Sequence, residues 1–104
     1  MKNKVSKLTD LKVSLSSVNK ALVAAKGEVP TLGWSDSELG NDRIGDGILH
    51  LDFLAQPPTG TPGQQISPIE VQRSFPLGPQ AQDITVHSET NEMSVTLPAI
   101  GDRP

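Results

Sequence analysis

The sequence has no cysteine, no tyrosine and only three aromatic side chains, Trp34, Phe53 and Phe75, in 104 residues. Without thiols the chain can form no disulfide, thiolate zinc site or iron–sulfur cluster, and it has no cysteine nucleophile. Aromatic rings bury the most area per residue, so their scarcity predicts a thin core. Chains of this size bury only about 60–70% of their unfolded surface. We therefore expect part of the apolar surface to be buried against another chain.

Long apolar runs are also missing. The basic start is interrupted by Lys7, Asp10 and Lys12 before an apolar stretch of about 7–15 residues can develop, so we expect no secretory signal. No run of about 18 apolar residues occurs, so we expect no membrane span. Together with the lack of cysteine, these features favour a cytoplasmic protein, or a component of an assembled particle, without membrane contact.

Charge is divided unevenly along the chain. Residues 1–26 contain six lysines and one acid, for a net charge of +5, whereas residues 27–104 contain three arginines and eleven acids, for −8. A basic N-terminal segment next to an acidic body indicates association with a protein, either a second copy or another partner.

The apolar side chains of residues 3–26 fall three and four residues apart. This is the a/d pattern of a coiled coil, and Lys26 followed by Gly27 is typical of a helix end. The spacing predicts a basic amphipathic helix over 1–27, used for oligomerisation or docking. The residues that line its apolar stripe are Leu8, Leu11, Leu15, Val18, Leu22 and Ala25.

A second interpretation of this segment comes from alternation. Leu11, Val13 and Leu15 alternate with polar residues, as in a strand, and serine is a mediocre helix former. The alternative is a strand over 11–15 followed by a helix from Ser16 or Ser17 through Lys26.

The remainder, residues 28–104, reads as an acidic, β-rich body. Residues 27–47 contain one proline and four further glycines among five acids, which predicts loops or turns. Residues 55–68 carry no charge but four prolines and two glycines, which predicts an extended or flexible connector. Alternation or apolar content predicts four strands, and a polar loop makes the last two a hairpin. The strands are Ile48–Leu54, Ile69–Phe75, Asp83–Ser88 and Met93–Leu97. The expected fold is α+β: the helix, then a small antiparallel sheet of three to four strands with long loops.

Two His-x-acid pairs are the most chemically suggestive feature of the body. His50 and Asp52 share one strand face, as do His87 and Glu89, and neighbouring strands would bring imidazoles and carboxylates together as metal ligands. Nothing in the sequence makes those strands neighbours, so we expect polar side chains on a solvated face and no metal. The acids and glycines of 41–47 do not have calcium-loop spacing and predict a turn.

Catalytic motifs are absent from the sequence. It has no nucleophile elbow, no His-Glu-x-x-His and no phosphate-binding glycine loop, and Ser88 points away from its neighbour His87 on a strand. We therefore expect no enzyme and no cofactor. The N-terminal lysines lack arginine or aromatic neighbours for base contacts, so nucleic acid is not the expected partner. Trp34 either anchors a partner or covers the small core.

The function expected from the sequence is that of a non-catalytic structural or assembly protein that self-associates or docks on a larger complex. Small accessory subunits of virus particles or bacterial machines have this organisation, an analogy of architecture alone. One alternative is a small monomeric inhibitor or adaptor whose acidic surface meets a basic protein. Another is a nucleic-acid accessory protein that uses the N-terminal lysines.

Overall fold

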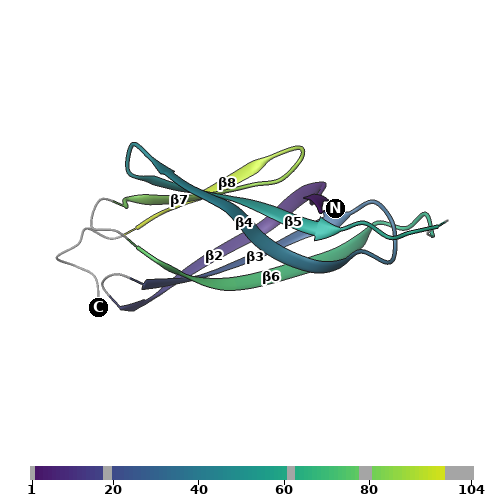
Figure 1. The fold of residues 1–104 in the computed structure, drawn as a ribbon, viewed down its shortest axis with the longest axis horizontal. Coiled ribbons are helices and arrows are strands. Elements are labelled where there is room, and N and C mark those ends of the chain that lie inside the picture. The colour runs from purple at the N-terminus through teal and green to yellow at the C-terminus, as the bar shows by residue number, and fades with distance from the viewer. Residues whose placement is uncertain (1, 18–19, 61–62, 78–80, 98–104) are drawn as a thin grey trace.

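The computed structural model describes residues 2–17, 20–60, 63–77 and 81–97, and these form eight β-strands and no helix. The α+β prediction is therefore wrong, and the fold is all-β. Two sheets lie one above the other (Figure 1). The strands are β1 (Asn3–Lys4), β2 (Lys7–Ser17), β3 (Lys20–Val29), β4 (Ser35–Gly45), β5 (Ile48–Gln56), β6 (Ser67–Pro76), β7 (Asp83–His87) and β8 (Glu92–Thr96).

The larger sheet has five strands and β5 at its centre. β4 pairs along the length of one edge of β5, so β7 and β1 share the other edge, with β8 beyond β7. The β5–β7 pairing is parallel and all the others are antiparallel. The smaller sheet is antiparallel in the order β2-β3-β6. A single antiparallel sheet of three to four strands was therefore the wrong expectation: there are two sheets, and one of them is mixed.

The segment predicted as a helix supplies β1, β2 and most of β3. The side chains of Leu11, Val13 and Leu15 of β2 point toward the five-stranded sheet. They are paired with Ala25, Val23 and Ala21 of β3. The three β3 residues are all buried. The period of two in both strands outweighs the three–four spacing because β6 pairs along the other edge of β3 and completes an apolar face. The alternative strand over 11–15 is confirmed, but the helix after it is wrong, as is the coiled coil.

Gly27 is a strand residue and not a helix cap. A Cβ at this position would lie 2.3 Å from the main-chain oxygen of Lys7 and 3.1 Å from a methyl group of Val5. The close approach occurs where the β2–β3 register shifts between Leu8 and Asp10. Glycine is therefore required by space, since any side chain would push the two strands apart.

Residues 35–45, expected as loop, form β4 in spite of their glycines. Two register shifts interrupt the β4–β5 pairing, and Asp36 and Asn41 beside them have φ values of 56° and 53°. The hairpin closes at Asp46-Gly47, where both residues have positive φ, as a two-residue primed turn demands. The turn expected within 41–47 is therefore present, but it occupies only the last two residues.

The four strands predicted in the acidic body are confirmed as β5, β6, β7 and β8, and so is the final hairpin. Their inward side chains meet those of β2 and β3 in one apolar core. The largest fully buried side chain is Phe53. The long axis of the molecule measures 51 Å against 21 and 19 Å for the others, so the sandwich is elongated. Among the described residues, no helix is long and apolar enough to cross a membrane.

Candidate functional site

The residues predicted to form an interface stripe do not share one surface. Leu8 is buried in the core, while Leu11 and Leu15 are partly buried against it. Leu22 is half-buried on the opposite face of β3 from the core, because it lies between buried Ala21 and Val23. Val18 falls outside the described residues. Trp34 packs partly against the core, and its indole N–H donates to Thr31 Oγ1 at 3.0 Å.

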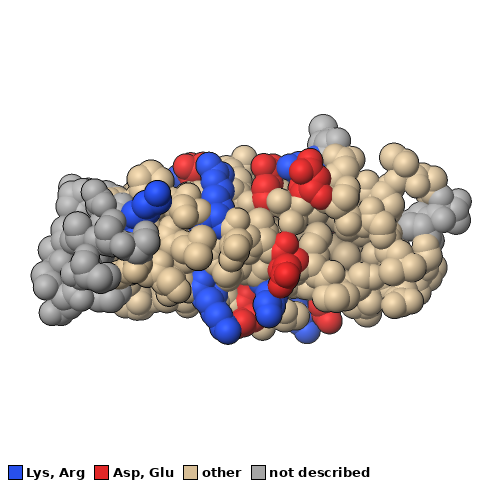
Figure 2. Space-filling view, turned by 90° about the horizontal axis from the view of Figure 1, so that it is seen from below, with Lys and Arg blue, Asp and Glu red and all other residues tan. Residues whose placement is uncertain are grey.

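The basic N-terminal segment is not a separate basic surface either. Its lysines are distributed over strands of both sheets, and Figure 2 shows basic and acidic side chains side by side over the middle of the molecule. Lys2 Nζ lies 3.3 Å from Asp36 and 3.4 Å from Glu38 of β4. Desolvation lowers the pKa of Lys2, but hydrogen bonds to the two carboxylates and their charges raise it above its ordinary value. The charge division of the sequence is thus partly neutralised within the fold.

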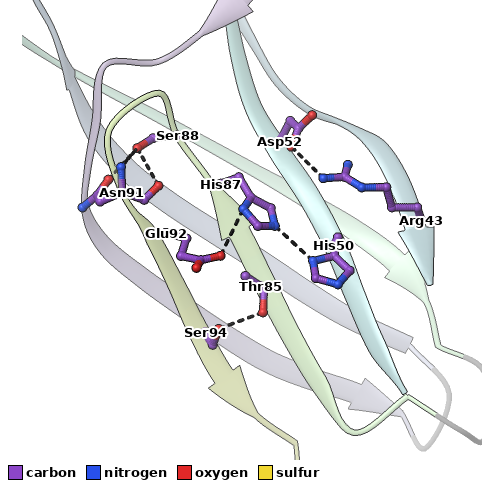
Figure 3. A network of polar contacts seen from close by, with 9 residues as sticks. All are labelled: Arg43, His50, Asp52, Thr85, His87, Ser88, Asn91, Glu92 and Ser94. Carbon is purple, nitrogen blue, oxygen red and sulfur yellow. Dashed lines mark hydrogen bonds and ion pairs between the residues drawn. The ribbon is translucent and has the colours of Figure 1, made fainter. Parts of the chain in front are cut away.

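A network of polar side chains crosses the outer face of the five-stranded sheet (Figure 3). It draws on β4, β5, β7 and β8, and two of its members, Asp52 and Thr85, are themselves buried. Within it, Thr85 and Ser94, which face each other across β7 and β8, share a hydrogen bond of 2.7 Å between their hydroxyl groups. Two further groups of residues in this network contain charged side chains or histidines.

The first group surrounds Asp52 of β5, which is only 5% exposed. Asn41 donates its amide N–H to Asp52 Oδ2 at 3.0 Å, and the Arg43 guanidinium donates to Oδ1 at 3.3 Å. Burial raises the pKa of Asp52, but the hydrogen bonds from Asn41 and Arg43, with the charges of Arg43 and Lys4, lower it below its ordinary value overall. Asp52 is therefore an ionised, fully engaged carboxylate that ties β4 to β5.

The second group is a chain from Glu92 through His87 to His50. Glu92 Oε2 lies 3.1 Å from His87 Nδ1, and His87 Nε2 lies 3.0 Å from His50 Nδ1. The planes of the two rings differ by 22°, and the ring centroids are 5.2 Å apart. This separation equals the N···N distance of 3.0 Å plus about one ring width, so the rings lie edge to edge. The facing nitrogens therefore point at each other along a nearly common line, as in a hydrogen bond in which one ring nitrogen donates and the other accepts.

The parallel pairing of β5 with β7 brings the histidines together. His50 is in register with Thr85 and Asp52 with His87, so the two imidazoles are diagonal neighbours on one face. The antiparallel β7–β8 pairing then places Glu92 opposite His87. The two His-x-acid pairs considered in the sequence contain both histidines, but their acids lie elsewhere: Asp52 is engaged by β4, and Glu89 lies in the exposed hairpin loop. One signal in the sequence could have identified Glu92: in the predicted hairpin of the last two strands, the pairing register places it opposite His87.

In the part of the chain that the structure describes, no group of three or more His, Cys, Asp or Glu side chains is arranged to hold a metal ion. Hollows of about 420 and 360 Å³ lie on the outer face of the three-stranded sheet, around Lys26 and Glu70. A third of about 380 Å³ lies beside Arg43 and Phe75. The two histidines line none of these three hollows, so these offer the imidazoles no substrate pocket.

One end of the long axis is formed by two loops without any charge. These are residues 30–34 and 57–66, of which 61–62 lie outside the described residues, and we call them the charge-free end. Figure 2 shows no charged side chain among the described atoms of its right-hand end, where Figure 1 places the two loops. Leu32 and Ile66 are 45% and 67% exposed there.

The two loops of the charge-free end are held together. The Leu32 N–H donates to the Gly63 carbonyl at 3.1 Å, and the Leu32 side chain covers Gly63 so closely that a Cβ there would lie 2.9 Å from it. Gly33, at φ 87°, fits against Pro58. Described residues of the proline-rich segment, which was predicted to be an extended or flexible connector, thus lie against residues 32–33 of the other loop.

The fold defines a class, the two-layer β-sandwich, in which an apolar core lies between two sheets. Comparisons of this chain with protein families, with curated proteins and with solved structures gave no match. Its function must therefore be argued from its own surfaces.

Proposed function

We propose that this protein is a non-catalytic structural protein that docks on another protein of a larger assembly through its charge-free end. The observation that carries the proposal is the concentration of exposed apolar side chains there. Of the three large apolar side chains that are exposed among the described residues, two, Leu32 and Ile66, lie in this end, and the third is Ile44 of β4.

Composition supports this assignment. Charged residues are depleted from the centres of protein interfaces, because burying an unpaired charge costs several kcal/mol. This chain has 20% charged residues, yet residues 29–35 and 53–69 contain none. A solvated loop has no need to exclude charge over both of these stretches.

The contacts between the two loops of the charge-free end support the proposal as well. The backbone hydrogen bond from Leu32 to Gly63 and the close approach of Gly33 to Pro58 hold described residues of the two loops together in the absence of a partner. A surface that is already ordered loses less conformational entropy on binding, so a small contact area can give useful affinity.

The first test uses Ile66→Glu and, as a matched control, Ile44→Glu. Both side chains are exposed, so neither substitution disturbs the core, and both add the same charge. The absolute mass of the full chain is measured by light scattering behind a sizing column at two concentrations. If the partner is a second copy, the wild type and Ile44→Glu exceed 11.1 kDa and Ile66→Glu does not.

The second test addresses a different partner. A photoreactive residue is placed at position 66 or at position 44 in the cells that produce the protein. We expect one defined cross-linked protein from position 66 that is missing from position 44, and that is lost when Leu32→Glu is added. A monomer of 11.1 kDa with no cross-link, or the same products from both positions, would contradict the proposal.

A further inference from the structure

We propose that His50 and His87 together bind one first-row divalent metal ion, with zinc as the probe, and that Glu92 orients His87 for this task. The inference does not depend on docking through the charge-free end. It rests on the 3.0 Å between His50 Nδ1 and His87 Nε2 and on the carboxylate of Glu92 behind the second ring.

The spacing of the two nitrogens suits a metal. Ligand nitrogens about 2.0–2.1 Å from a tetrahedral zinc lie roughly 3.3 Å apart, so the ring nitrogens need to separate by only a few tenths of an ångström. Both side chains are half-buried on the outer face of the sheet, and the His87 side chain is 23% exposed, so an ion and its water ligands can reach them from solvent.

The Glu92 contact settles which nitrogen of His87 carries the proton. An ionised carboxylate only accepts hydrogen bonds, so His87 Nδ1 must be the N–H that donates across 3.1 Å. In the neutral ring, Nε2 then carries a lone pair and faces His50. A carboxylate that holds the far N–H is the usual arrangement behind a metal-ligating histidine, because it fixes the ring and raises its basicity.

His50 must change more than His87 when the ion binds. Without metal, His50 Nδ1 carries the proton that is donated to His87 Nε2. With metal, that proton must move to His50 Nε2 through solvent, and each ring must turn by roughly 35° so that the two lone pairs, which face each other without metal, converge on the ion at the tetrahedral angle. The metal ion thus replaces the shared proton, and proton and metal compete for the same two nitrogens.

The neighbouring charges are already accounted for. Arg43 and Asn41 of β4 engage Asp52, the only carboxylate on β5, and on β8 the charged group near the rings is Glu92 itself. The protein therefore supplies two nitrogen ligands, and water fills the remaining positions. Imidazole ligands suit zinc, nickel or copper and not magnesium or calcium, which prefer oxygen.

The composition of the chain makes the test sharp, because it has two histidines and no cysteine. Tag-free protein is titrated with ZnCl₂ by calorimetry near neutral pH, with MgCl₂ as a control that should give no binding. We expect one zinc per chain. His50→Gln and His87→Gln should each abolish binding, since a chelate needs both rings. Two independent single-histidine sites would instead give two ions per chain, falling to one in either variant, and that result would overturn the proposal.

Glu92 has its own test. Glu92→Gln should weaken zinc binding by about tenfold or more without changing the stoichiometry, the usual effect of losing such a supporting carboxylate. Glu89→Gln, an exposed acid in the adjoining loop, is the matched control and should leave the affinity unchanged. Equal affinities for the wild type and Glu92→Gln would remove the positioning role of Glu92.

Thermal unfolding and circular dichroism distinguish the loss of zinc binding from the loss of the fold. Zinc should raise the unfolding temperature of the wild type and leave that of His50→Gln unchanged, while circular dichroism shows the same β-spectrum for both. Absence of zinc binding by the folded wild type would refute the site.

Discussion

The sandwich is closed differently along its two sides, where an edge strand of one sheet meets an edge strand of the other. On the first side β4 meets β6, and two side chains bridge the gap at separate points. Ser37 Oγ donates to the Glu70 carbonyl at 2.9 Å, and the Arg73 guanidinium donates to the Leu39 carbonyl at 2.8 Å. The same guanidinium lies 4.7 Å from the centre of the Phe75 ring.

On the second side β2 meets β8, and the hydrogen bonds that bridge the two sheets there lie at one end, around the loop between β7 and β8. The Asn91 side chain accepts from the Leu8 N–H at 2.8 Å and donates to the Leu8 carbonyl at 3.0 Å, like a short extra strand. Thr90 binds the Ser6 carbonyl beside it. Farther along, Leu11, Val13 and Leu15 are only half-buried.

The two sides show how this small sandwich protects the edge strands of its sheets. Unpaired strand edges invite pairing with other chains, and both sides use side chains in place of further strands. On the first side the bridging hydrogen bonds lie at two separate points, whereas on the second side they gather around the loop 89–91, where the Asn91 amide makes two of them. The two sides should therefore respond unequally to single substitutions.

The largest effect is expected from Asn91→Ala. It removes both bonds to Leu8, a residue that is 2% exposed, and leaves a nearly buried N–H and carbonyl without their partner. We expect a loss of about 2 kcal/mol in the free energy of unfolding, measured by chemical denaturation. Thr90→Val, next in the same loop but exposed, is the control and should cost about 0.5 kcal/mol. Equal losses for both variants would show that Leu8 does not depend on the Asn91 amide.

A smaller effect is expected from Arg73→Met on the first side. Methionine keeps much of the apolar stem but loses the bond to Leu39 and the contact with the Phe75 ring. Because Arg73 is exposed and Ser37 still bridges the gap, we expect a loss of about 1 kcal/mol, measured in the same way. Gln72→Met, on the outward face of the same strand, should change stability little. A loss larger than that of Asn91→Ala would reverse the ranking of the two sides.

The smallest effect, and one that depends on pH, is expected from Asp52→Asn. Asn41 and Arg43 of β4 hold Asp52, so this carboxylate helps to attach the strand that closes the first side. Since Arg43 is half exposed, the pair should contribute only about 0.5 kcal/mol near neutral pH. The pKa of Asp52 is lowered in the folded state, so its contribution is present above the ordinary value of 3.8 and is lost as the pH falls through the lowered one.

The measurement for Asp52→Asn is the stability difference from the wild type between neutral and acid pH. The difference should shrink on acidification below 3.8, because protonation makes the wild-type group neutral as well. A difference that stays constant would mean that the carboxylate charge is not what holds Asn41 and Arg43.

Local signals in the sequence were sufficient for part of this fold. Alternation along β7 and β8, the polar loop between them and the apolar run of β5 predicted those strands correctly, because their turn chemistry and patterning agree. The segment 7–29 was ambiguous, since three–four spacing and alternation coexist in it. Asp46-Gly47 is a typical hairpin-turn dipeptide. The glycines that precede it in the sequence nevertheless favoured a loop over the long strand β4.

The sequence by itself determined the scarcity of aromatic residues, the lack of thiols, the charge-free stretches and the identity of the only two histidines. Tertiary structure decided that Lys7–Ser17 and Lys20–Val29 are strands, because only pairing of β3 with β6 turns their alternating side chains into a buried face. It also decided that His50 and His87 meet, because the parallel register of β5 and β7 joins residues 37 positions apart. Strand pairing between distant segments depends on their combined burial, which no local pattern of residues expresses.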